Sequence, residues 1–305
     1  MSEAATIAAA EAAIRVGSKS FAAASRLFDR RTRESATLLY AWCRHCDDVV
    51  DDQELVFRTG QARPANAAER LAGLEIATRD ALDGRPAQAP AFAALAAVMR
   101  RHQIPHDLPL AHLRGFRMDV EGRRYETLDD TLDYSWHVAG VVGVMMAHVM
   151  GVRDAATLGR AADLGLAFQL TNIARDLVED ARAGRVYLPA EWLAQAGLPA
   201  GEIAQPRHRV RLAALAARLV DAAEPLYSSA ALGIAALPPR SAWAIATARG
   251  VYRQIGADVK ALGPRAWERR VSTTRGAKLR HVARGGLAAL ALVLGPGRTA
   301  TADPA

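Results

Sequence analysis

The sequence has few cysteines: Cys43 and Cys46 are the only two among its 305 residues. With His45 between them they form a CxxC motif that, taken alone, suggests a redox or zinc site. A structural zinc site usually needs four nitrogen or sulfur ligands, and a redox CxxC normally lies where a strand runs into a helix. No second cysteine pair exists, and the surrounding residues favour a helix. We therefore interpret both thiols as packing residues of a reduced, cytoplasmic protein.

Long hydrophobic runs and clustered aromatic residues are also missing. The apolar stretch over residues 286–297 is too short to span a bilayer, and no signal peptide is expected from the amino-terminal residues. The 39 basic and 32 acidic residues give a net charge of +7, but the basic residues form no long run and few aromatic residues lie among them. The lack of a basic run with aromatic residues disfavours nucleic acid as a partner. The net positive charge favours phosphorylated substrates or a membrane surface.

Strand-like alternation of apolar and polar residues is scarce, whereas Ala, Leu, Arg and Glu dominate. We predict an all-α fold of about ten helices in a single domain over residues 1–295, followed by a disordered tail over 296–305. The apolar residues 137–151 predict a buried central helix. Gly140 and Gly143 within it cost about 1 kcal/mol each relative to alanine, which indicates a packing or pocket role.

Two acidic motifs repeat the same helical spacing. Asp47 and Asp51 form one DxxxD motif, and Asp176 and Asp180 form another, with Asn172 one turn before it. Residues four apart lie on one face of a helix, where two bare carboxylates repel each other. One such pair is common on a solvated surface. Two pairs on separate helices, the second with an amide beside it, predict hard oxygen ligands for Mg²⁺, which would relieve the repulsion.

Basic and hydroxyl side chains near these motifs predict a phosphate site. Arg44 lies three residues before Asp47 and hence on the same face, which suits a diphosphate oxygen bound beside the metal. For Arg175 we favour an intrahelical salt bridge. Residues 17–21, GSKSF, add hydroxyl and ammonium groups. The sequence therefore predicts two acidic helices facing each other across Mg²⁺, with an apolar cavity below, for metal-assisted departure of diphosphate from an allylic carbon.

With these motifs the sequence resembles the squalene and phytoene synthases, which join two isoprenoid diphosphates head to head. The resemblance extends over nearly the whole chain and rests on residues 17–21, 40–52, 115–120, 134–143, 165–189 and 241–256. The second acidic motif followed by GRVYLP is a very specific segment. The form of the first motif, YAWCRHCDD, is similar to that of bacterial members in carotenoid pathways. The resemblance implies the all-α isoprenoid synthase fold, with helices around a central cavity.

The resemblance also implies roles for individual residues. Mg²⁺ or Mn²⁺ would bind oxygen-bearing side chains that include four catalytic aspartates: Asp47, Asp51, Asn172, Asp176 and Asp180. Three aromatic residues would stabilise cationic intermediates, although a structural role suits each equally well: Tyr40, Tyr134 and Tyr252. The residues implied in binding the diphosphates or the apolar chains are Ser18, Phe21, Arg44, Val138, Gly143, Gln169, Asn172 and Arg253.

The implied reaction has two halves. One geranylgeranyl diphosphate loses its diphosphate, the allylic cation alkylates a double bond of a second molecule, and proton loss closes the cyclopropane of prephytoene diphosphate. That intermediate ionises, rearranges and loses a proton to give phytoene, in a cavity that must exclude water. No NADPH is expected as a cofactor, and the absence of a GxGxxG motif agrees with this.

Three alternatives remain open. A sister enzyme would make dehydrosqualene or presqualene diphosphate from farnesyl diphosphate. The depth of the cavity sets the length of the substrate, and the sequence does not show that depth. A terpene cyclase would use one substrate and usually carries DDxxD and NSE motifs. A non-catalytic helical scaffold or basic nucleic-acid binder would tolerate Asp176→Asn. We expect isoprenoid diphosphates as substrates, a cytoplasmic protein with peripheral membrane contact, and other carotenoid-pathway enzymes as partners.

Overall fold

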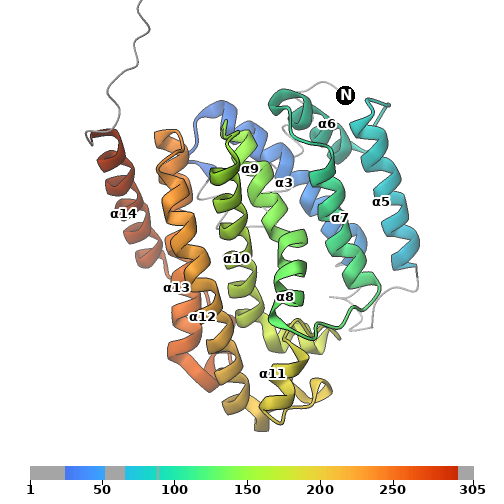
Figure 1. The fold of residues 1–305 in the computed structure, drawn as a ribbon, viewed down its shortest axis with the longest axis vertical. Helices are drawn as coiled ribbons and strands as arrows, with labels where there is room; N and C mark the ends of the chain where they lie inside the picture. The colour runs from blue at the N-terminus through green and yellow to red at the C-terminus, as the bar shows by residue number, and fades with distance from the viewer. Residues whose placement is uncertain (1–24, 52–65, 88, 295–305) are drawn as a thin grey trace, which may run out of the picture.

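The fold is helical. The computed structural model describes residues 25–51, 66–87 and 89–294, and within these ranges it contains no β-strand (Figure 1). The all-α prediction is therefore confirmed. The α-helices are α3 (Arg30–Asp51), α5 (Ala67–Leu82), α6 (Pro90–His102), α7 (Asp107–Val120), α8 (Leu128–Ser135), α9 (Val141–Val149), α10 (Ala155–Arg182), α11 (Ala190–Gln195), α12 (Arg209–Ile234), α13 (Pro239–Leu262) and α14 (Arg275–Leu294).

Helix α10 lies at the centre of the molecule (Figure 1) and packs against α9, α12 and α13. It begins after Asp154, whose side chain accepts a hydrogen bond from the backbone N–H of Thr157 at 2.8 Å. Such a cap satisfies one of the donors that a helix start leaves open. The helix is 28 residues long, and its last turns carry the second acidic motif. One well-capped, packed element therefore positions that motif.

Two large hydrophobic clusters make up most of the core. One gathers residues of α3, α5, α6, α7 and α9 and includes the fully buried Trp42 and Leu95. The other gathers residues of α10, α12 and α13 and includes Leu170 and Tyr227. Burial of each such side chain stabilises the fold by about 1.5–3 kcal/mol. The residues beside the first acidic motif, Cys46 and Val50, belong to the first cluster, whereas Leu177 and Val178 beside the second motif belong to the other.

The apolar residues 137–151 do not form a single α-helix. A π-helical turn over Trp136–Gly140 precedes α9. Both predicted glycines are closely packed: a Cβ on Gly143 would lie 2.3 Å from the backbone oxygen of Ala161, and one on Gly140 would lie 2.6 Å from the side chain of Leu166. Gly165 of α10 is equally close, since its Cβ would lie 2.3 Å from the backbone oxygen of Ala139. The backbone of α10 therefore touches that of α9 and that of the π-helical turn, which confirms a packing role for these glycines.

No helix among the described residues is long and apolar enough to cross a membrane. The predicted tail over 296–305 lies outside the described residues.

Candidate active site

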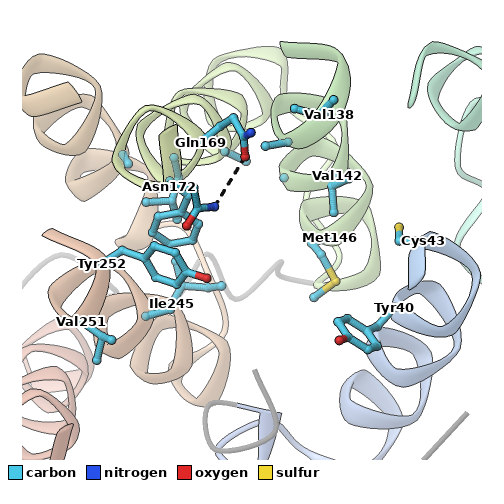
Figure 2. Close-up of a pocket in the computed structure, with 18 of the residues that line it drawn as sticks. Tyr40, Cys43, Val138, Val142, Met146, Gln169, Asn172, Ile245, Val251 and Tyr252 are labelled. Atoms are coloured by element: carbon cyan, nitrogen blue, oxygen red, sulfur yellow. Dashed lines mark hydrogen bonds between the residues drawn. The ribbon is translucent and has the colours of Figure 1, made fainter. Parts of the chain in front are cut away.

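A large cavity opens among the helices. Its volume is about 1100 Å³, slightly above the roughly 300–1,000 Å³ typical of small-molecule pockets. Figure 2 shows side chains of α3, α9, α10 and α13 around this space. Apolar groups such as Val142 and Met146 make up much of its wall, and charged residues of both acidic motifs line it as well. The cavity therefore combines a hydrocarbon-compatible interior with an ionic site.

The first acidic motif lies on α3 and is half exposed. Arg44 donates a hydrogen bond to Asp47, with an Nη1–Oδ2 distance of 3.1 Å, and its Nη2 lies 2.6 Å from Oδ1 of Asp48. All three side chains line the cavity, Asp48 among them although the sequence reasoning did not select it. Asp51 is the last residue of α3, and the structure describes its backbone but not its side chain. Arg44 therefore shares a face with Asp47, as the spacing predicts.

The second motif is more buried. The carboxylate of Asp176 accepts hydrogen bonds from the guanidinium of Arg175, which is the salt bridge expected for that residue. Arg270, in the segment before α14, donates to the same carboxylate, with an Nη2–Oδ2 distance of 3.0 Å. Burial tends to raise the pKa of Asp176, but the two arginines hold it below its ordinary value. Asp176 is thus ionised and preorganised.

The pKa of Asp180 is shifted in the opposite direction to that of Asp176. Burial, and then the charge of Asp176 one turn away, raise its pKa to about 7. One turn before Asp176, the amide nitrogen of Asn172 lies 3.5 Å from Oε1 of Gln169 (Figure 2). The buried side-chain oxygen of Asn172 has no hydrogen-bond partner within the described part of the chain. A crowded carboxylate pair beside an unsatisfied amide oxygen is a donor set suited to Mg²⁺ or Mn²⁺.

The donor set is not a preassembled cage. Among the described residues, no three His, Cys, Asp or Glu side chains lie close enough together to hold a metal ion unaided. Mg²⁺ typically takes only one or two protein carboxylates and completes its shell with water and substrate phosphates. The residues therefore fit a metal that binds together with a diphosphate.

Two tyrosines bind an acidic residue of the cavity that belongs to neither motif. Asp119 accepts a hydrogen bond from the hydroxyl of Tyr134 at 3.0 Å and one from Tyr187 at 2.9 Å. The two rings stack, with centroids 4.6 Å apart. Burial, and then the charge of Asp119, raise the pKa of both phenols, so both remain protonated. Asp119 and Tyr187 were missed as site residues, although both lie in segments that carry the family resemblance.

The two other predicted tyrosines face the cavity from different helices. Figure 2 shows Tyr40 of α3 and Tyr252 of α13 on opposite sides of the space. Tyr252 stacks on Phe168, with ring centroids 4.2 Å apart. Burial raises the pKa of both phenols. The cavity is thus bordered by neutral aromatic rings, whose electron-rich faces attract cations.

The predicted lining residues have mixed placements. Val138, Gly143 and Gln169 line the cavity. Arg253 does not: its guanidinium lies 2.8 Å from the carboxylate of Glu224, outside the cavity lining. Ser18 and Phe21 lie outside the described residues. Four cationic side chains that were not selected do line the cavity: Arg160, Arg185, Arg270 and Lys278.

The two cysteines carry no metal-site chemistry in this environment. Cys46 is fully buried in the cluster around α3, whereas Cys43 lines the cavity. Burial raises the pKa of the Cys43 thiol to about 12 and also raises that of Cys46. Zinc binds the thiolate form. The ring of His45 packs against Phe92, with centroids 5.4 Å apart, and does not line the cavity.

Comparison with known proteins identifies this arrangement. The family model for squalene/phytoene synthase matches residues 14–277. The chain therefore belongs to the squalene/phytoene synthase family. Within the family, it is 58% identical over 264 residues to the 15-cis-phytoene synthase of Enterobacter agglomerans, covering 87% of this chain and 89% of that protein. It is 52% identical over 274 residues to the 15-cis-phytoene synthase of a Paracoccus species, covering 90% and 88% of the two chains.

Solved structures of the family share the fold. A dehydrosqualene synthase in complex with a ligand superposes with a TM-score of 0.82 at 27% identity, covering 94% of this chain and 97% of that one. A squalene synthase from Alicyclobacillus acidocaldarius has a TM-score of 0.74 at 24% identity, covering 85% and 94%. The isoprenoid synthase fold expected from the family resemblance is confirmed.

Proposed function

We propose that this protein is a 15-cis-phytoene synthase, which condenses two geranylgeranyl diphosphates head to head through prephytoene diphosphate. The observation that carries this assignment is identity of 52–58% to bacterial 15-cis-phytoene synthases over most of both chains. The site agrees with it, because charged groups for two diphosphates adjoin an apolar cavity of about 1100 Å³. The protein is accordingly a prenyltransferase of carotenoid biosynthesis.

Divalent metal ions belong to this proposal. Asp47 and Asp51 on α3, with Asn172, Asp176 and Asp180 on α10, would hold Mg²⁺ or Mn²⁺ together with the substrate diphosphates. The bound metal would neutralise the charge that develops on the departing diphosphate. The support is the pKa of Asp180, which burial and then the charge of Asp176 raise, and the oxygen of Asn172, which has no hydrogen-bond partner among the described residues.

The chain's own residues would bind, orient and shield. Arg44 lies beside the first motif and can exchange its carboxylate partners for phosphate oxygens. The rings of Tyr40, Tyr134 and Tyr252 would stabilise carbocations. Because the hydroxyl of Tyr134 donates to Asp119, that phenol is fixed in place. The apolar walls would keep water away from the cations.

The second candidate is the C15 reaction, in which farnesyl diphosphate gives dehydrosqualene or presqualene diphosphate. It is favoured by the overlap with a dehydrosqualene synthase at a TM-score of 0.82. The purified protein should be incubated with Mg²⁺ and either farnesyl or geranylgeranyl diphosphate, and the hydrocarbons identified by mass spectrometry. Phytoene from the C20 substrate is expected. Turnover of the C15 substrate alone would overturn the assignment. NADPH should have no effect on the product.

The location proposed for the enzyme is the cytoplasmic face of a membrane, in peripheral contact and near other carotenoid-pathway enzymes. The support is chemical: substrates and product are apolar, and the chain has a net charge of +7. Fractionation of cells expressing the protein should place it partly with membranes, from which high salt releases it. Recovery solely in the soluble fraction would contradict this location.

A further inference from the structure

Helix α14 lies at the edge of the molecule beside α13 (Figure 1). Its inner face is tied to that neighbour: Nε1 of Trp243 donates to the backbone oxygen of Val282 at 2.7 Å, and a Cβ on Gly285 would meet Thr247 at 2.7 Å. Lys278 and Val282 also line the cavity. One face of α14 thus closes the proposed active site, and the opposite face is open.

The open face carries a continuous apolar stripe. Leu279, Ala283, Leu287 and Leu290 follow one another at spacings of four, four and three residues, so they share one side of the helix. The three leucines are 69%, 68% and 52% exposed. Among the described residues only three other large hydrophobic side chains are exposed, one on α5 and two on α12. Scattered single residues of that kind are ordinary, whereas a stripe on one helix indicates a contact surface.

The same region concentrates the positive charge of the protein. Residues 269–294 contain six of the 39 basic residues and none of the 32 acidic ones, which leaves 33 basic against 32 acidic residues in the rest of the chain. Arg280 and Arg284 are exposed and lie next to the leucine stripe. Within the described part of the chain neither forms an ion pair. Nearly the whole net charge of +7 thus belongs to one short segment.

We propose that the open face of α14 docks the protein on an anionic lipid bilayer, with Leu279, Leu287 and Leu290 at the acyl boundary and Arg280 and Arg284 at the headgroups. Exposed leucines beside arginines are the design of helices that lie in the membrane interface. A second copy of this chain fits the face poorly, because two acid-free basic segments would repel each other. The biological role of this docking rests on the proposed function. Docking places a wall of the cavity against the bilayer, which would supply the isoprenoid diphosphates and receive the apolar product.

Vesicle binding by the purified full-length protein tests the proposal without any substrate. The probes are vesicles of phosphatidylcholine alone and of an equal mixture of phosphatidylcholine and phosphatidylglycerol. The wild type should bind the anionic vesicles far more tightly. Arg280→Gln with Arg284→Gln should weaken that binding about 30-fold, from about 1 kcal/mol per arginine at an anionic surface. Leu279→Gln, Leu287→Gln and Leu290→Gln combined should weaken it at least about tenfold.

The chain offers matched controls. The triple substitution Ile76→Gln, Val210→Gln and Leu232→Gln removes the three other large hydrophobic side chains that are exposed in the described ranges. Arg100→Gln with Arg114→Gln removes the same charge from α6 and α7. Both controls should bind as the wild type does. Equal losses in control and α14 variants, or unchanged binding in the α14 variants, would overturn the proposal. So would a change in oligomeric state, measured by light scattering, without a change in vesicle binding.

Product formation in detergent micelles separates this proposal from the assignment of function. All α14 variants should form phytoene there at the wild-type rate, because none of the substituted side chains lines the cavity. Vesicle binding without phytoene formation by the wild type would refute the assigned activity and leave the docking surface intact. Phytoene formation without vesicle binding would refute the docking surface alone.

Discussion

The two acidic motifs share one spacing but have different surroundings. On α3 the side chains of Asp47 and Asp48 are 39% and 47% exposed, and one arginine contacts both. On α10 the side chain of Asp176 is 14% exposed and is held by two arginines, while burial helps to raise the pKa of Asp180 to about 7. The same spacing thus gives a solvent-exposed cluster on α3 and a largely buried cluster on α10, where two arginines fix the carboxylate of Asp176.

This difference matters because the electrostatic cost of a carboxylate pair depends on its solvation. Water screens the charges of the α3 cluster, so the repulsion between its carboxylates costs little. The α10 cluster is poorly screened and becomes favourable once a cation arrives. We therefore expect both motifs to be needed for activity, and only the second to lower the stability of the metal-free protein.

The largest effect is expected on activity. Asp176→Asn and Asp47→Asn should each lower kcat for phytoene formation about 1000-fold, since each removes a proposed ligand from metals that contribute several kcal/mol. Product formation is measured by chromatography, and folding by circular dichroism. Asp221→Asn, which alters an exposed acid paired with Lys260 on the outer surface, is the control and should remain active. Full activity of Asp176→Asn would restore the scaffold interpretation.

Mg²⁺ and diphosphate should stabilise the folded protein more when they bind together than when either binds alone. Mg²⁺ with inorganic diphosphate should raise the free energy of unfolding by about 2.7 kcal/mol at a hundredfold excess over Kd, a rise of several degrees in Tm. Mg²⁺ alone should do much less, because the described residues form no preassembled cage. Scanning calorimetry measures both. A full shift with Mg²⁺ alone would show that the diphosphate is not needed to complete the metal site.

Metal-free stability distinguishes the motifs directly. Asp180→Asn should raise the free energy of unfolding at pH 8 by about 1–2 kcal/mol, because it removes a buried charge and its repulsion with Asp176. Asp47→Asn should change it by no more than about 0.5 kcal/mol, as is usual for exposed sites. Thermal melts in the presence of EDTA provide the measurement. Equal effects at the two positions would mean that burial does not separate the motifs.

The smallest effects are expected away from both motifs. Arg253→Gln should leave kcat and KM within about twofold of the wild type, and cost at most about 1 kcal/mol through its exposed pair with Glu224. Cys43→Ser with Cys46→Ser should preserve the dependence on Mg²⁺, although the buried hydroxyl at position 46 will lower stability. A rise in KM for Arg253→Gln would instead support the phosphate contact implied by the family resemblance.

Local patterns in the sequence were sufficient to predict the helical fold and the two motifs, because i to i+4 spacing decides which side chains share a face. Contacts between distant segments left no such signal. Tyr187 reaches Asp119 across 68 positions, and Arg270 reaches Asp176 across 94. For Arg253 the family resemblance implies a phosphate contact, as it implies a role in the cavity for the neighbouring Tyr252. Adjacent residues on a helix point in different directions, so Tyr252 faces the cavity whereas Arg253 faces Glu224.

The glycine contacts between α9 and α10 also restrict how this enzyme can be redesigned. Any side chain at Gly143 or Gly165 would collide with backbone rather than with a movable group. The wall that these helices share is therefore closed to the usual route for shortening a binding site, in which a small residue is replaced by a bulky one. Attempts to select shorter or longer prenyl chains should start from the movable side chains of other walls, such as Ile245 and Val251 of α13.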